Sequence, residues 1–243
     1  MRYFFITGSS RGIGKGLVER ILQEKDTQVH GFSRKSSFEH DRYYHHSVDL
    51  ADVNWLTEHV NEFFPKLEDA KQIVLINNAG TLGEVKYLGE LENSSIAHLF
   101  NLNVTAVAVL MNKFINAYHH QSAEKLIINV SSGAGKSAVD GWSGYCASKA
   151  ALDMLSKVAQ LELQKKGLSE HFKVYALAPG VVDTEMQGEI RQSSKENFSK
   201  LDKFINYKKE GALDDARHTA GKFMELINNA GKFKDVMQDV RQY

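Results

Sequence analysis

Short apolar runs alternate with amphipathic stretches along most of the chain. The apolar runs predict strands over residues 2–7, 27–33, 43–50, 72–76, 125–130, 172–177 and 236–240. Apolar residues at helical spacing predict helices over residues 17–24, 53–64, 94–118, 150–164 and 214–228. Residues 72–76 are apolar at nearly every position, which is typical of a parallel strand buried on both faces. The alternation therefore predicts an α/β fold, with helices on both faces of a doubly wound parallel sheet of about seven strands.

One stretch interrupts this alternation. Residues 181–211 are polar, rich in Ser, Lys and Glu, and long for a connection within a compact domain. We therefore expect a mobile, partly helical lid over a binding site. The chain has only two prolines and shows no Pro/Ser-rich linker or repeat, so residues 1–243 are expected to form a single domain.

Composition narrows the functional class. Thirty basic and thirty acidic side chains cancel, so neither nucleic acid nor a membrane surface is an expected partner. No run approaches the roughly 18 apolar residues that are needed to span a bilayer. Cys146 is the single cysteine, which excludes an internal disulfide and is typical of a reducing compartment, so we expect a cytoplasmic protein.

A glycine-rich turn follows the first predicted strand. It reads Gly8-Ser-Ser-Arg-Gly12-Ile-Gly14 and leads into the first predicted helix. Glycine lets the backbone approach a ligand closely, and a helix N-terminus offers unpaired N–H groups to a phosphate. The turn therefore indicates a nucleotide site. Its spacing differs from the common G-x-G-x-x-G, and an ordinary strand-to-helix turn is the alternative interpretation.

The end of the second predicted strand indicates which dinucleotide would bind. An acidic residue here would bind the ribose 2′-hydroxyl of NAD, but the sequence has Ser33 followed by Arg34 and Lys35. These cations favour the 2′-phosphate of NADP, and Arg11 in the glycine-rich turn could reach the same group. We therefore favour NADP(H), with solvated loop charges as the alternative.

Tyr145 and Lys149 lie four residues apart at the start of a predicted helix. Residues at this spacing share one helix face, so a phenol and an ammonium group can reach the same site. A cation at about 4 Å would lower the pKa of a phenol from about 10 toward working pH. The pair is then a candidate proton donor and acceptor. For the pair alone, an amphipathic tyrosine and a solvated lysine are the simpler interpretation.

Several motifs in series carry a family resemblance. They are Thr7-Gly-Ser-Ser-Arg-Gly-Ile-Gly14, Asn77-Asn-Ala-Gly80, Ser132, Tyr145-x-x-x-Lys149 and Pro179-Gly180. In this order and spacing they resemble the short-chain dehydrogenases/reductases, and the resemblance covers almost the whole chain. It implies a Rossmann-type sheet and hydride transfer between a nicotinamide cofactor and a carbonyl or alcohol.

A narrower resemblance lies in three further stretches. Residues 141–154, residues 179–187 and the C-terminal residues 239–243 are similar to the sepiapterin-reductase-like branch. Within that branch they are most similar to benzil reductases that form (S)-benzoin. This resemblance implies a small ketone or vicinal diketone as substrate.

The family resemblance assigns four catalytic residues. Tyr145 would exchange a proton with the substrate oxygen, and Ser132 would hydrogen-bond the same oxygen. Lys149 would lower the pKa of Tyr145 and bind the nicotinamide ribose. Asn103 would hold a water that links Lys149 to solvent. Taken one at a time, Ser132 could be a strand-end turn residue, and Asn103 could satisfy backbone groups in its own helix.

The resemblance also assigns cofactor contacts. Asp49 would contact the adenine, and Thr184 would bond the carboxamide or a phosphate, although a helix cap and an ordinary loop hydroxyl are the alternatives. The complete expected set is Gly8, Ser10, Arg11, Gly12, Ile13, Gly14, Ser33, Arg34, Asp49, Leu50, Asn78, Ala79, Gly80, Tyr145, Lys149, Pro179, Gly180, Val182 and Thr184.

Substrate contacts are expected from Trp142 and Met186 beside Ser132 and Tyr145. An aromatic diketone would favour such apolar and aromatic walls, while a core or interface position is the alternative for Trp142. The thiol of Cys146 is expected to face the core rather than to react. His40, His45 and His46 lack a coherent ligand spacing, so no metal site is expected.

Other functions remain open at this stage. The same mechanism could serve a pterin side chain, a sugar or a 3-oxoacyl thioester, and the chain could also be a non-catalytic NADP-binding sensor. Retention of the complete set of Asn103, Ser132, Tyr145 and Lys149 favours an enzyme. The resemblance further implies a homodimer or homotetramer, formed through the helices at 94–118 and 145–164.

Overall fold

All seven strands form one parallel sheet. The computed structural model describes residues 1–243. The strands are β1 (Arg2–Thr7), β2 (Thr27–Ser33), β3 (Tyr43–Ser47), β4 (Gln72–Asn77), β5 (Glu124–Val130), β6 (Phe172–Ala178) and β7 (Met237–Asp239). Their spatial order is β3-β2-β1-β4-β5-β6-β7, and every neighbouring pair is parallel. This confirms the predicted α/β class and doubly wound topology.

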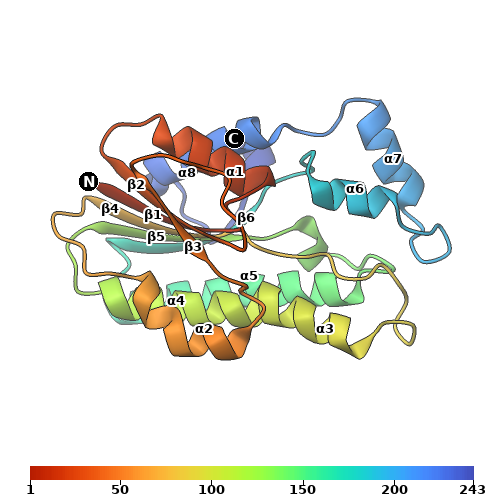
Figure 1. Cartoon of the computed structure of the whole chain (residues 1–243), viewed down its shortest axis with the longest axis horizontal. Coiled ribbons are helices and arrows are strands. Elements are labelled where there is room, and N and C mark those ends of the chain that lie inside the picture. The colour runs from red at the N-terminus through yellow and green to blue at the C-terminus, as the bar shows by residue number, and fades with distance from the viewer.

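Helices cover both faces of the sheet (Figure 1). On one face lie α1 (Gly12–Leu22) and α8 (Ala216–Asn228). On the other face lie α2 (Val53–His59), α3 (Asn93–Phe100), α4 (Ala106–Tyr118) and α5 (Ser143–Lys165). Strand β1 shows how the sequence builds the two layers. The side chain of Phe4 belongs to the core under α1 and α8, and that of Phe5 belongs to the core over α4 and α5, because successive strand residues point to opposite faces.

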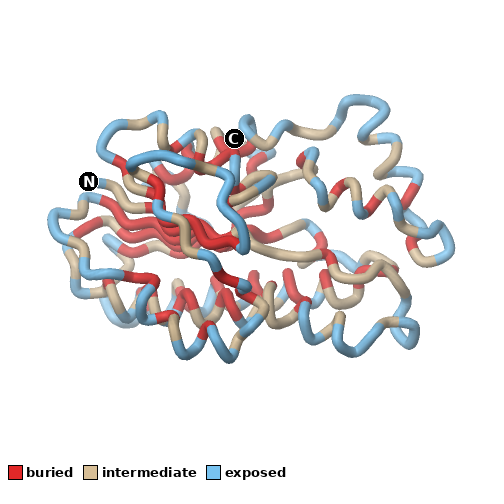
Figure 2. Tube along the Cα trace, viewed as in Figure 1, coloured by how far each residue is buried: buried red, intermediate tan, exposed pale blue.

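The two cores are mainly apolar and differ in character. Phe5 stands at the centre of an aromatic group that includes Phe64, Phe114 and Tyr118, with ring centroids 5.2 to 6.2 Å from its own. The core on the opposite face is built mainly from aliphatic side chains of the strands, α1 and α8. Figure 2 shows the strands as the most buried part of the chain, with exposed positions on the outer faces of the helices. A rigid sheet therefore holds the loops at its carboxyl edge.

Two predicted boundaries were wrong. Strand β3 ends at Ser47 rather than at residue 50, because the chain leaves the sheet there and buries Val48 and Leu50 against the aromatic core. Helix α1 begins at Gly12 rather than at residue 17, so the last two glycines of the motif form its first turn. Sequence pattern missed this turn because it contains little apolar surface.

The long predicted helix at 94–118 contains an unexpected irregularity. Helices α3 and α4 are joined by a π-helical segment, Asn101–Thr105, so that one continuous helix runs from Asn93 to Tyr118. By length and composition this helix would qualify as a membrane span. Its most apolar 18 residues have a mean hydropathy of 1.5, and 33% of them are buried. A core helix of a soluble protein meets the same criteria, so the predicted absence of a long apolar run is not contradicted. The cytoplasmic location stays a prediction.

The segment at 181–211 contains two helices, α6 (Glu185–Arg191) and α7 (Leu201–Lys209). An isolated parallel bridge between Val182 and Asp214 closes its base. Figure 1 shows both helices extending beyond the carboxyl edge of the sheet. The predicted helical content is confirmed, while mobility of the segment stays a prediction.

Candidate active site

A cavity of about 1060 Å³ opens at the carboxyl edge of the sheet. Its walls come from the segments that follow β1, β2, β4, β5 and β6, together with α6 and α7. Strands β1 and β4 are neighbours in space, and the chain order reverses between them, which is where open α/β sheets bind ligands. The volume is at the upper end of that of ordinary small-molecule sites, so it has room for an extended ligand.

The glycine-rich turn forms one end of the cavity. Gly8 and Gly12 have φ of +66° and +53°, a conformation that side chains other than glycine rarely adopt. A Cβ atom on Gly14 would lie 2.2 Å from the Gly8 carbonyl oxygen, so only glycine allows α1 to approach β1 this closely. No side chain caps the N-terminus of α1. Its free N–H groups and the glycine cradle fit the phosphates of a dinucleotide.

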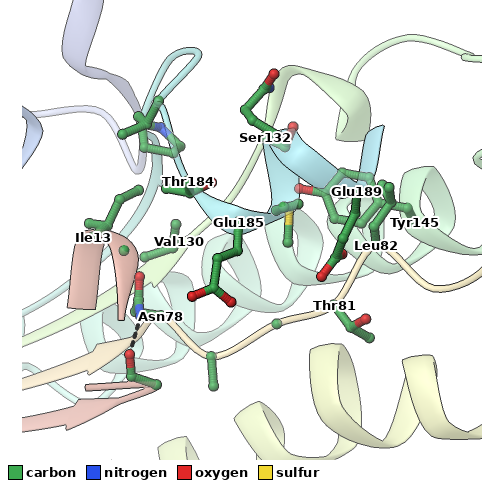
Figure 3. A pocket seen from close by; sticks show the side chains of 18 of the residues that line it. Ile13, Asn78, Thr81, Leu82, Val130, Ser132, Tyr145, Thr184, Glu185 and Glu189 are labelled. Atoms are coloured by element: carbon green, nitrogen blue, oxygen red, sulfur yellow. Dashed lines mark hydrogen bonds between the residues drawn. The ribbon is translucent and has the colours of Figure 1, made fainter. Parts of the chain in front are cut away.

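Asn78 connects the ends of β1 and β4 (Figure 3). Its side-chain amide donates to the carbonyls of Thr7 and Gly8 at 3.0 and 3.2 Å. In return, the Thr7 hydroxyl oxygen accepts from the backbone N–H groups of Asn78 and Ala79, both at 2.9 Å. These bonds hold the glycine-rich turn and the segment Asn78–Gly80 as one rigid cavity wall.

The end of β2 presents two cations to the cavity. Arg34 and Lys35 line it and are exposed, and neither has a carboxylate partner. The Ser33 hydroxyl donates to the Lys35 carbonyl at 2.8 Å, and the Ser33 carbonyl oxygen lies 2.9 Å from Nε2 of His45. Arg11 also lines the cavity, but it forms an ion pair with Glu185 of α6.

Asp49 and Leu50, which are expected to contact the adenine, line the cavity. Asp49 is exposed, and its carboxylate accepts from the Ala51 N–H at 3.0 Å. The helix cap considered as an alternative role belongs instead to Asp52, which accepts from the Trp55 N–H at the start of α2. Asp49 is thus not the N-cap of α2.

Tyr145 and Lys149 lie in the first two turns of α5, which begins at Ser143, and both are buried. The Lys149 ammonium donates to the Val130 carbonyl at 2.7 Å, and burial lowers its pKa to about 8. Burial raises the pKa of Tyr145, and a hydrogen bond with the Ser132 hydroxyl offsets only part of that rise. Figure 3 shows Ser132 and Tyr145 at the same end of the cavity.

The expected lowering of the Tyr145 pKa by Lys149 is therefore corrected. The Lys149 nitrogen lies 5.6 Å from the centre of the tyrosine ring and is directed to the Val130 carbonyl. Burial of the phenol is the largest cause of the change in its pKa, and it raises the pKa. In this structure Tyr145 is consequently a proton-holding acid at neutral pH.

Asn103 lies behind the cavity wall, in the π-helical segment, and is 1% exposed. Its Oδ1 accepts from the Thr81 N–H at 2.9 Å, and its Nδ2 donates to the Thr81 carbonyl at 2.8 Å. Nδ2 also lies 3.1 Å from the Ser148 hydroxyl. The side chain therefore satisfies backbone groups of a distant loop rather than of its own helix. Its role in holding a water stays a prediction.

Aromatic side chains surround the far end of the cavity. Trp142 stacks on Phe198 with ring centroids 5.0 Å apart and meets the edges of Tyr145 and Phe204 at 5.7 and 5.4 Å. Trp142 thus lines the cavity and also belongs to a small core beneath α6 and α7, while its contact with a substrate stays a prediction. Cys146 packs partly buried against this core, with its thiol 3.8 Å from the Ser137 carbonyl.

The cavity gathers nearly all the residues singled out from sequence. Gly14 and Asn103 alone do not line it, because each lies one layer behind the surface. Sequence reasoning named the predicted lid at 181–211 only as a segment, and the lid residues that line the cavity include Glu185, Glu189, Ile190, Lys200, Lys203, Phe204 and Tyr207. It missed further lining residues outside the lid, including Thr81, Leu82, Val130, Val139 and Arg241. The helical spacing of Phe204 and Tyr207 was a usable signal, whereas nothing local points to Arg241, which arrives from the C-terminus. No three His, Cys, Asp or Glu side chains are grouped as a metal site.

Comparison with known proteins gives consistent matches. A family model described as short chain dehydrogenase matches residues 2–195. The benzil reductase ((S)-benzoin forming) of Bacillus cereus is 35% identical, with 93% of this chain and 94% of that protein covered. The protein of the same name in Bacillus subtilis (strain 168) is 32% identical, with 98% of this chain and 99% of that protein covered. Sepiapterin reductase of Mus musculus is 35% identical, over 73% of this chain and 66% of that protein.

Solved structures share the fold. A short-chain dehydrogenase/reductase from Saccharomyces cerevisiae is 25% identical and superimposes with a TM-score of 0.80, covering 99% of this chain and 96% of its own. A 4-hydroxyisoleucine dehydrogenase, solved in complex with NADH, has a TM-score of 0.77 at 20% identity, with 98% of this chain and 96% of that chain covered. The second of these supports the fold alone.

Proposed function

Since the chain belongs to the short-chain dehydrogenase family, we propose that it is an NADPH-dependent carbonyl reductase that acts on small ketones or vicinal diketones such as benzil. It is an oxidoreductase of CH–OH and C=O groups by family and by its reductase relatives. One observation carries the narrower proposal. Ser132, Tyr145 and Lys149 meet at the aromatic end of the cavity, in a chain aligned over nearly its whole length with two benzil reductases.

The residues at this end suit carbonyl reduction. A nicotinamide cofactor bound in the cavity would supply the hydride. Tyr145, which holds its proton at neutral pH, donates that proton to the carbonyl oxygen as charge develops there. Ser132 hydrogen-bonds the same oxygen and stabilises the charge. Lys149 places a positive charge beside the phenol, which favours the phenolate that remains after proton transfer.

The aromatic walls suit an apolar substrate. Trp142, Phe204 and Tyr207 line the cavity, with Trp142 against Tyr145 and Phe204, and Tyr207 against Phe204. Met186 of α6 packs against the same small core. Flat rings of an aryl ketone would stack on such side chains and displace water from them. These contacts support a benzil-like substrate over a sugar, which would need a wall rich in hydrogen-bonding groups.

Consumption of NADPH and NADH, measured side by side with benzil and 1-phenyl-1,2-propanedione, tests the proposal. Rapid NADPH consumption with either diketone is the expected result. Absence of turnover with both cofactors, in protein that still binds NADPH, would contradict the substrate assignment. Faster turnover with NADH would contradict the cofactor assignment alone.

A second candidate is reduction of a pterin side chain. The alignment with the Mus musculus sepiapterin reductase supports it, although it covers less of both chains than the alignments with the benzil reductases. Sepiapterin offered as a substrate in the same assay separates the two candidates, because the preferred carbonyl will show the higher kcat/KM.

Arg34 is expected to determine the preference for NADPH. Arg34→Ala should weaken NADPH binding by about 10- to 100-fold, since it removes a charge-assisted hydrogen bond to the 2′-phosphate. NADH binding should stay nearly unchanged. Titration of cofactor fluorescence gives both dissociation constants. Arg20→Ala is the matched control, because Arg20 is an exposed cation of α1 that does not line the cavity. Equal losses for both cofactors would contradict the assignment.

We also propose that α5 forms the interface of a homodimer or homotetramer. Met154, Val158 and Leu161 are exposed by 59%, 42% and 50%, and their spacing places them on one face of the helix. Val158→Asp is expected to dissociate the assembly, because it buries an unpaired carboxylate at the contact. Light scattering after size exclusion measures the mass. Arg20→Asp, at an exposed position of α1 on the opposite face of the sheet, is the control and should leave the assembly intact.

A further inference from the structure

Three consecutive residues at the end of β5 are bound to three residues of α5. The Val130 carbonyl accepts from the Lys149 ammonium at 2.7 Å. The Ser131 hydroxyl donates to the carboxylate of Asp153. The hydroxyl of the next residue, Ser132, faces the phenol of Tyr145 and opposes the rise in the pKa of that phenol. The α5 residues are spaced four apart at 145, 149 and 153, so one helix face holds the strand end at three successive points.

Asp153 is the member of this face with no assigned role. It is 6% exposed and does not line the cavity. A buried carboxylate is costly unless it is paired or hydrogen-bonded, so its position calls for a function. The turn after Ser132 packs directly on it, because a Cβ atom on Gly135 would lie 2.9 Å from Asp153 Oδ2. Asp153 therefore contacts the strand end before Ser132 and the turn after it.

We propose that Asp153 is a positioning residue, which fixes the end of β5 through Ser131 so that Ser132 faces Tyr145 and the Val130 carbonyl faces Lys149. Ser131 and Ser132 are adjacent in the chain, so a bond that fixes Ser131 also restricts the backbone that carries Ser132, without occupying the site. The inference rests on the proposed carbonyl reduction, for which Ser132, Tyr145 and Lys149 are the reacting set.

The charge of Asp153 has a second effect. It opposes the burial that lowers the pKa of Lys149. The charged groups that face the Asp153 carboxylate are Lys149 and Lys157 of α5 and Lys136 of the turn after β5. Removal of the negative charge would leave Lys149 easier to deprotonate. The alkaline limb of the pH–rate profile would then move to lower pH.

Three variants test the role of Asp153. Asp153→Ala should lower kcat by about 100-fold, as expected for a misplaced hydrogen-bonding group, and leave the NADPH dissociation constant unchanged. Asp153→Asn keeps an acceptor for Ser131, so it should lose less kcat but still shift the alkaline limb downward. Ser131→Ala removes the same bond from its other end. If the bond is the cause, the double variant should be no slower than Asp153→Ala.

Ser156→Ala is the matched control. Ser156 is buried on the same helix and hydrogen-bonds Asn129 of β5 at 2.8 Å, but it does not touch the strand end. It should lower the melting temperature and leave kcat and the pH profile intact. The proposal is overturned if Asp153→Ala loses stability but keeps kcat within about twofold, or if Ser156→Ala slows turnover equally.

Hydrogen exchange separates this inference from the proposed function. Asp153→Ala and Ser131→Ala should accelerate exchange of the amides at 131–135, and Ser156→Ala should not, whether or not the chain reduces any carbonyl. If the wild-type protein turns over no carbonyl substrate while the variants show this exchange pattern, the proposed function is contradicted and the positioning contact is retained. Unchanged exchange in the Asp153 and Ser131 variants overturns the positioning contact itself.

Discussion

Tyr145→Phe is expected to lower turnover by about 100- to 10,000-fold, the usual contribution of a general acid. The variant keeps the ring, which is buried against Trp142, and removes only the hydroxyl that donates the proton. NADPH binding should stay close to that of the wild type, because the other cofactor contacts are untouched. Steady-state kinetics with benzil, together with fluorescence titration of NADPH, measures both effects.

Tyr207→Phe is the matched control for this variant. Tyr207 also lines the cavity, but it stands on α7 and hydrogen-bonds none of the proposed catalytic residues. Its loss of a hydroxyl should leave most of the turnover. Near-wild-type activity in Tyr145→Phe would contradict the proposed mechanism. An equal loss of turnover in Tyr207→Phe would instead indicate that Tyr207 of α7 takes part in proton donation.

Lys149→Met is expected to produce the largest change in the pH dependence of stability. An unfolded lysine keeps its proton up to its ordinary pKa of 10.5, whereas burial lowers the pKa of Lys149 to about 8 in the folded protein. Between these values the unfolded state binds more protons, so stability rises with pH. Below pH 8 the folded protein carries the full cost of the buried charge, about 3 kcal/mol.

The variant has no charge to bury at any pH. Its free energy of unfolding should exceed that of the wild type, and the difference should be largest at neutral pH. The Val130 carbonyl loses its donor in the variant, which reduces this difference by about 1 kcal/mol. The difference should shrink as the pH rises through the window between 8 and 10.5. Urea unfolding from neutral pH to about pH 9.5 measures it, below the range in which tyrosines ionise. Lys157→Met, an exposed lysine of the same helix, should show no such trend.

The gain in stability should accompany a loss of activity. Lys149 supplies the positive charge beside Tyr145, and the variant lacks it. A Lys149→Met protein that was less stable than the wild type at neutral pH, and that showed the same dependence on pH, would contradict the account of a costly buried cation. The pair of measurements thus tests whether stability is sacrificed for catalysis at this residue.

Local pattern was sufficient for the sheet and for most of the cavity wall. Residues 72–76 are apolar throughout most of their length, and this run became β4, which is buried on both faces. The glycines at 8 and 12 needed positive φ, which is a property of the turn itself. Such features can be read from sequence because they depend on neighbours within a few residues.

The sequence alone determined the α/β class, the order of its strands and helices, and the residues that would meet at the carboxyl edge. Tertiary structure decided the rest. It set the direction of the Tyr145 pKa, which burial raises. It also placed Asn103 on the distant Thr81 backbone, Asp153 beneath the turn that follows Ser132, and Arg241 at the cavity. Burial and hydrogen-bond partners are supplied by segments far away in the chain, so no local pattern of apolar and polar residues contains them.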